Sequence, residues 1–148
     1  METSELIKSL GTKLGIDLEP NDDGIYSFEA DDLSVSILDL PELDCIALVG
    51  DLGEPPPEGL EALYKAMMEA NHLFRDTHGA TLSLNPENSH FEICKALPNK
   101  LLDSDSFFLD IERFVNILEV WSKIVLNYRG APTEESLPSL GTNGFLQV

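Results

Sequence analysis

The stretch "GIYSFEADDLSVSILDLPELDCIALVG", residues 24–50, decides the fold of this chain. Apolar and polar residues alternate over residues 33–38, which is the period of a strand with one buried face. Residues 25–30 and 45–50 also have strand composition, and the second range is apolar on both sides, as in a strand covered on both faces. Turn residues at 31–32 and 41–44 separate the three ranges. The stretch therefore predicts an antiparallel meander.

Helical patterns flank this meander on both sides. Residues 3–14 carry leucines one helical turn apart and are followed by Gly15, so we expect a helix that ends there. Three prolines at 55–57 end the meander, because proline cannot continue a central strand. Either the last of these prolines or Glu58 opens a second helix, which we expect to run to about Arg75.

The rest of the chain predicts a hairpin and a third helix. Residues 80–85 and 90–97 alternate in polarity around a short turn and are expected to be strands. A third helix runs to about Tyr128, and its apolar residues repeat at steps of four and three. The candidate residues for its N-terminal cap are Asp103, Ser104 and Asp105.

The predicted element order is α-β-β-β-α-β-β-α. Runs of strands broken by single helices indicate an α+β fold, here a twisted antiparallel sheet packed with helices. We expect one domain over residues 1–130. Residues 131–148 are rich in Pro, Ser, Gly and Thr and lack periodicity, so we expect a flexible C-terminal tail.

The charge of the chain excludes several classes of partner. It has 27 acidic and 9 basic residues and a formal net charge of -18. Such a surface repels nucleic-acid phosphates and anionic membranes and attracts basic partners. Residues 1–10 lack the apolar core of a signal peptide, and no stretch has the length of a membrane span, so we expect a cytoplasmic protein without membrane insertion. Cys45 and Cys94 lie in apolar strands and are expected to be buried thiols without a disulfide.

No motif in the chain indicates chemistry. Residues 19–30 resemble a calcium loop but lack its final carboxylate. His72, His78 and His90 do not have the spacing of a zinc site, and no nucleophile or phosphate-binding motif occurs. We therefore expect no catalytic residues, no metal and no cofactor. An enzyme whose site is assembled from distant residues remains an alternative at this point.

The second predicted helix is apolar on more than one side. A helix that lies on a sheet needs a single apolar stripe, and this one adds a face of small residues, Ala62, Ala66 and Ala70. An exposed apolar face invites a partner, so we expect a homodimer in which this helix pairs near a two-fold axis. The alternative is that the helix is sandwiched within the monomer.

The order of elements and two strings resemble the class I type III secretion chaperones, the Tir chaperone family. "GIYSFEADDLSVSILDLPELDCIALVGDLGEPP" is similar to the family's first meander, with a strand ending in Phe-x-x-Asp and an apolar strand closing in Gly before proline. "EALYKAMMEANHLFRDTHGATLSLNPENSHFEI" is similar to its middle, with a helix ending in Ala-Asn-x-x-Phe, a glycine turn and a hairpin. The resemblance covers about residues 5–128.

The resemblance implies a cytosolic homodimer that binds secreted effector proteins and performs no chemistry. The chaperone-binding segment of the effector would lie extended along apolar grooves, add a strand to a sheet edge, and stay soluble and competent for export. The secretion ATPase is a further candidate partner. The positions that the resemblance assigns to effector binding are Leu6, Leu10, Leu14, Ile25, Phe28, Val35 and Ile37. Those that it assigns to the dimer interface are Leu63, Met67, Ala70, Asn71 and Phe74.

Two alternatives stay open at this point. Phe28, Val35 and Ile37 also fit an ordinary core. A dimeric interaction or regulatory module with the same fold, unconnected to secretion, would have the same sequence pattern.

Overall fold

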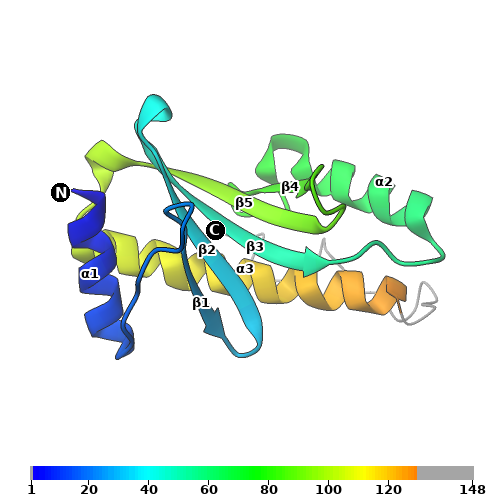
Figure 1. Ribbon diagram of the computed structural model, residues 1–148. Helices are drawn as coiled ribbons and strands as arrows, with labels where there is room; N and C mark the ends of the chain where they lie inside the picture. The colour runs from blue at the N-terminus through cyan, green and yellow to red at the C-terminus, as the bar shows by residue number, and fades with distance from the viewer. Residues whose placement is uncertain (1, 130–148) are drawn as a thin grey trace. The chain divides into compact units, whose positions relative to one another are not determined.

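The computed structural model describes residues 2–129 and has the predicted order of elements (Figure 1). The predicted tail, residues 131–148, lies outside the described residues. The helices and strands, in chain order, are α1 Thr3–Leu14, β1 Tyr26–Ala30, β2 Leu33–Leu40, β3 Cys45–Gly53, α2 Leu60–Asn71, β4 Thr81–Leu84, β5 Phe91–Pro98 and α3 Ser104–Arg129. Three short 3-10 turns are inserted, η1 Pro41–Leu43, η2 His72–Phe74 and η3 Asn99–Leu101. The predicted α+β fold is confirmed.

One antiparallel sheet contains all five strands, in the order β1-β2-β3-β5-β4. The β1–β2 hairpin turns at Asp31 and Asp32, whose φ angles are 50° and 68°. Positive φ at both central residues suits the twist of a two-residue hairpin. Because the order places β1 and β4 at the ends, these two strands are the edges of the sheet.

The second helix is shorter than the sequence predicts. It begins at Leu60, because Gly59 before it has a left-handed φ of 74°. An added Cβ at Gly59 would lie 3.4 Å from the Tyr128 ring. It ends at Asn71, and Leu73 and Phe74 then adopt left-handed φ angles of 55° and 56°. The predicted helix from residue 57 or 58 to about Arg75 is therefore wrong at both ends.

The contacts of the chain divide it into two compact units, and each has its own core. The first unit comprises residues 2–50 and 95–116, and the second comprises residues 51–94 and 117–129. In the first unit α1, the meander and the first half of α3 bury Leu6, Ile7, Leu10, Val35, Ile37, Ile46, Leu48 and Phe107. In the second unit α2, the β4–β5 hairpin and the second half of α3 bury Leu63, Met67, Ala70, Phe91, Ile93, Leu118 and Trp121.

Polar contacts fix the ends of the elements. Asp103 caps α3, since its Oδ1 accepts the Ser106 N–H at 2.8 Å and its own N–H donates to the Ser106 Oγ at 2.9 Å. In the second unit the Trp121 indole N–H donates to the Asp76 carbonyl at 3.1 Å and holds the segment after α2.

Both cysteines are free thiols. Cys45 is buried as expected, whereas Cys94 is only partly buried, because its face of β5 is not fully covered. Burial raises the pKa of the Cys94 thiol. No helix within residues 2–129 combines the length and the apolar character that crossing a membrane requires.

Candidate binding groove

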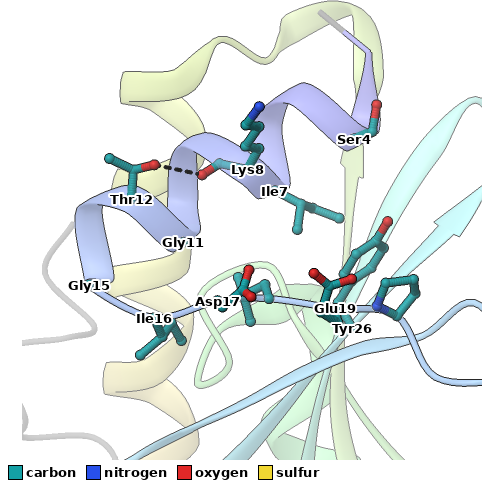
Figure 2. A pocket seen from close by; sticks show the side chains of 12 residues that line it. Ser4, Ile7, Lys8, Gly11, Thr12, Gly15, Ile16, Asp17, Glu19 and Tyr26 are labelled. Carbon is teal, nitrogen blue, oxygen red and sulfur yellow. Dashed lines mark hydrogen bonds between the residues drawn. The ribbon is translucent and has the colours of Figure 1, made fainter.

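A groove of about 560 Å³ lies in the first unit between α1 and the segment that leads to β1 (Figure 2). One wall is α1, the opposite wall is residues 15–20, and Tyr26 at the start of β1 closes one end. Figure 2 shows Ile7 pointing from α1 into this space. The lining residues are Ser4, Ile7, Lys8, Gly11, Thr12, Gly15, Ile16, Asp17, Leu18, Glu19, Pro20 and Tyr26.

Two glycines shape the groove. Gly15 has a φ of 71° and ends α1, which turns the chain back along the helix. The Ile16 N–H then donates to the Gly11 carbonyl at 3.0 Å. A Cβ at Gly11 would lie 2.9 Å from the Ile16 carbonyl oxygen, so only glycine permits this close approach.

A turn at Asn21 returns the chain to the sheet. The Asn21 Oδ1 accepts the N–H groups of Asp23 and Ile25, each at 2.9 Å. These two hydrogen bonds define a turn at Asn21. The turn places β1, an edge strand, directly beside the groove.

The groove is lined by both apolar and charged residues, and the charged ones are mainly acidic. Ile16 is 43% exposed, and Leu18, Pro20 and Tyr26 add apolar surface. The charged lining residues are Asp17 and Glu19 against Lys8. Neither histidine nor cysteine lines the groove. Such a surface suits apolar side chains that are flanked by basic residues.

Contacts at the C-terminal end of α1 hold this wall of the groove in place. The Lys13 Nζ lies 2.9 Å from the Asp105 Oδ1 and 5.0 Å from the centre of the Phe108 ring. Leu6 and Leu10 on the opposite side of α1 are 0% and 1% exposed. The helix is therefore fixed on one side, and its other side is available to a ligand.

A second set of exposed apolar side chains lies in the second unit, and we call it the α2 face. It consists of Tyr64 and Met68 on α2 and Leu73 and Phe74 in η2, which are 39%, 73%, 81% and 56% exposed. Two bulky residues in consecutive left-handed conformations are strained. The strain is tolerated in a turn that holds both side chains in solvent.

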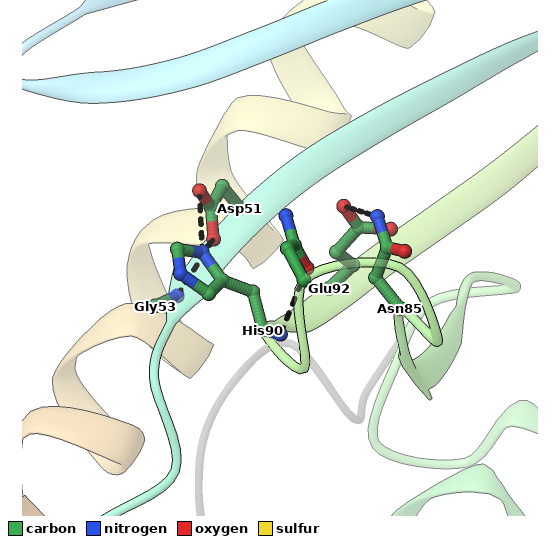
Figure 3. A network of polar contacts seen from close by, with 6 residues as sticks. Asp51, Gly53, Asn85, His90 and Glu92 are labelled. Atoms are coloured by element: carbon green, nitrogen blue, oxygen red, sulfur yellow. Dashed lines mark hydrogen bonds and ion pairs between the residues drawn. The ribbon is translucent and has the colours of Figure 1, made fainter.

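A polar network in the second unit contains a His–Asp pair (Figure 3). The His90 Nδ1 lies 3.1 and 3.2 Å from the two carboxylate oxygens of Asp51, and Asp51 also accepts the Gly53 N–H at 2.8 Å. Nearby, the Asn85 amide donates to Glu92 at 3.1 Å. Within residues 2–129 no group of three or more His, Cys, Asp or Glu side chains could hold a metal ion. The network links β3 to the β4–β5 hairpin, and we interpret its role as structural.

Comparison with known proteins identifies the family. The model of the Tir chaperone protein (CesT) family matches residues 5–122. The chain belongs to this family. A comparison with curated proteins finds no match.

Solved structures share the CesT-family fold at low sequence identity. A chain in the crystal structure of the ExsC–ExsE complex has a TM-score of 0.69 at 15% identity, over 84% of this chain and 97% of that one. A chain in the HopA1–SchA chaperone–effector complex has a TM-score of 0.62 at 15% identity, over 86% and 92%. A chain in the ExoT–SpcS complex from Pseudomonas aeruginosa has a TM-score of 0.59 at 18% identity, over 80% and 97%.

The residues that line the groove of this CesT-family chain are sequence neighbours of the predicted effector-binding residues. Leu6, Leu10, Phe28, Val35 and Ile37 are at most 8% exposed and form core. Leu14 is 37% exposed and Ile25 is partly exposed, but neither lines the groove. The sequence signal for the groove was the apolar pair Ile16 and Leu18 directly after the helix-ending Gly15.

The residues predicted for the dimer interface show the same division. Leu63, Met67 and Ala70 are at most 5% exposed within the protomer. Asn71 is partly buried, and its side chain bonds to the backbone of β4. Phe74 alone of the five belongs to the α2 face. Met68 follows the predicted Met67 directly and is 73% exposed, compared with 56% for Phe74.

Proposed function

We propose that this CesT-family chain is a cytoplasmic chaperone that binds an extended segment of a type III secretion effector and keeps it soluble and competent for export. The observation that carries the proposal is the groove, which combines apolar lining residues with mainly acidic ones and is adjacent to the edge strand β1. Family membership and the likeness to chains from chaperone–effector complexes support it. The function consists of binding and requires no catalytic group.

Each part of the site contributes a different kind of affinity. Strand addition at β1 provides backbone hydrogen bonds, which tolerate many sequences. The groove takes apolar side chains near Ile16 and Tyr26 and fixes the register of the segment. Asp17 and Glu19 favour basic residues in the ligand, as does the net charge of -18. The segment loses conformational entropy on binding, and a large contact area offsets that loss.

We also propose that the active form is a homodimer that pairs through the α2 face. Four large apolar side chains are exposed there, and burying their exposed fractions against a second copy would contribute roughly 0.5–2.5 kcal/mol each. The predicted interface is thereby kept on α2 and moved to its exposed side.

The test uses three exposed positions in the full chain. Ile16→Asp introduces a charge into the groove, and Met68→Asp introduces one into the α2 face. Leu109→Asp is the matched control, because Leu109 on α3 is 45% exposed, close to the 43% of Ile16, and lies outside both surfaces. Each tagged chain is purified from its own cells, co-purifying polypeptides are identified by mass spectrometry, and the masses of the complexes are measured by light scattering.

We expect the unmodified chain and Leu109→Asp to be dimers that retain an exported protein through its N-terminal region. Ile16→Asp should remain a dimer and lose at least about tenfold in effector affinity, which corresponds to a cost of about 1.4 kcal/mol. Met68→Asp should become a monomer. Recovery of partners that are never exported would overturn the secretion role and favour a regulatory module of the same fold.

A further inference from the structure

The outer edge of β4 is occupied by a side chain. β4 is the last strand of the sheet, and Leu82 lies at its centre opposite Ile93 of β5. The Asn71 Oδ1 accepts the Leu82 N–H at 2.9 Å, and the Asn71 Nδ2 donates to the Leu82 carbonyl at 3.1 Å. The carboxamide therefore satisfies both backbone groups of one residue, which is the pattern that a neighbouring strand would supply.

These contacts block much of the edge. Backbone groups that point outward from an edge strand occur at every second residue, so the four residues of β4 offer two such positions, and Leu82 is one of them. An incoming strand would have to displace the Asn71 side chain before it could pair at the centre of β4.

Asn71 is not needed to attach α2 to its unit. Leu63, Met67 and Ala70 are buried on that helix, and the Asp76 N–H donates to the Ala70 carbonyl at 3.2 Å just beyond it. The Tyr64 ring also lies edge-on to Phe91 at 5.7 Å. Asn71 is thus held by its neighbours in a position from which its amide reaches the strand.

We infer that Asn71 closes the β4 edge against strand addition and thereby directs an extended ligand to β1. This inference rests on the proposed function for its biological meaning, but its physical content concerns the chain alone. β1 is the other edge, and its first residue, Tyr26, lines the groove. A sheet with one closed edge accepts one strand per protomer, in a defined place.

The experiment compares Asn71→Ala, Asn71→Asp and Asn116→Ala in the full chain without any ligand. Asn116 is an exposed residue of α3 and serves as the control for the loss of an amide. Hydrogen exchange is followed at the Leu82 and Ile93 amides, and mass is measured by light scattering as the concentration rises. Aspartate keeps the acceptor for the Leu82 N–H but places a second oxygen against the Leu82 carbonyl.

In Asn71→Ala we expect the Leu82 amide to exchange about tenfold faster, as the loss of one hydrogen bond predicts, while the Ile93 amide is unchanged. The same variant should associate beyond the mass of the unmodified chain as its open edges pair. In Asn71→Asp the Leu82 amide should stay protected. Equal acceleration at Leu82 and Ile93 would show a general loss of stability and overturn the inference, as would faster exchange at Leu82 without added self-association.

Experiments with the ligand distinguish failure of the edge closure from failure of the proposed function. If a captured effector segment binds the unmodified chain at one strand per protomer and Asn71→Ala at two, both proposals hold. If no exported protein is captured but the exchange and association results appear as expected, the edge closure stands and the secretion role fails.

Discussion

At the scale of single residues, the groove depends on the absence of a Cβ atom at Gly11. Gly11 is the ninth residue of the 12-residue helix α1, and glycine within a helix is normally unfavourable. Its lack of a Cβ lets the Ile16 carbonyl approach and keeps residues 15–20 close to the helix. Glycine at position 11 thus lowers the intrinsic stability of α1 and allows residues 15–20 to form a wall of the groove.

Gly11→Ala should therefore weaken ligand binding, unlike a substitution by alanine at an ordinary helix position. The added Cβ would meet the Ile16 oxygen at 2.9 Å, and the resulting shift of residues 15–20 should cost about 1–3 kcal/mol of stability. Gly24→Asn is the control, because Gly24 does not line the groove, asparagine tolerates its left-handed φ of 78°, and no atom lies within 4 Å of the position of its Cβ. Calorimetry with the captured effector segment and thermal unfolding measure both effects. Equal affinity of the two variants would contradict this account of the groove.

Asp103 makes the stability of α3 depend on pH. The hydrogen bond from the Ser106 N–H, with that from its hydroxyl, holds the pKa of Asp103 below its ordinary value of 3.8. The carboxylate therefore contributes stability that is present above the pKa of the unfolded chain and is lost as the pH falls through the lower pKa of the folded chain.

The variant Asp103→Asn keeps a capping side chain and loses the charge. We expect it to melt a few degrees below the unmodified chain at neutral pH, with the difference shrinking as the pH falls below 3.8. Thermal unfolding of both chains between pH 7 and acid pH measures this. A difference that does not change with pH would show that the charge has no role in the cap.

At the scale of elements, η2 combines strain with exposure. Leu73 has a φ of 55° and is 81% exposed, so the folded protomer gains little from its side chain and bears the conformational cost. Burial of the Leu73 side chain in an assembly, as we propose for the dimer, would offset this conformational cost.

Leu73→Gly should separate these two effects. Glycine adopts the left-handed conformation without strain, so the protomer should become more stable by about 1 kcal/mol, while the dimer loses an apolar contact and dissociates more readily. Thermal unfolding at low protein concentration and sedimentation equilibrium measure the two quantities. Leu126→Gly provides the contrast, since Leu126 is exposed within α3 and glycine there should cost about 1 kcal/mol. A loss of protomer stability in Leu73→Gly would refute the assignment of strain.

The sequence predicts the elements far better than it predicts which face of each element is used. The strands follow from alternation between turn residues, and the hairpin at Asp31–Asp32 from residues that tolerate positive φ. On α1, by contrast, Leu6, Ile7 and Leu10 are equally apolar, and tertiary packing alone determines that Ile7 lines the groove. The end of α2 was missed for a similar reason, because leucine and phenylalanine carry no signal for a left-handed turn.

At the scale of the whole molecule, charge would act with opposite sign on the ligand and on the second copy of the proposed dimer. A protomer of formal charge -18 attracts a basic segment and repels its own partner. Salt screens both interactions, with a Debye length of about 8 Å at physiological ionic strength.

Raising the salt concentration should therefore slow capture of the effector segment and strengthen the dimer. We expect the association rate constant to fall by about tenfold or more from low to high salt, with a smaller change in dissociation, since charge acts mainly on encounter. Stopped-flow fluorescence measures the rates, and sedimentation at the same salt concentrations measures the dimer. A dimer that weakens with salt would indicate that ion pairs, and not the apolar α2 face, hold it together.

All the residues that line the groove lie between Ser4 and Tyr26, one short continuous part of the chain. In the proposed site, the residues that take the side chains of the ligand are thus encoded in a compact segment of the gene, apart from the residues of the α2 face and from Asn71. A chaperone built in this way can acquire a new client by mutation or recombination within that segment, without redesign of its sheet or its assembly. The separation gives such proteins a simple evolutionary route for following effectors as these diverge.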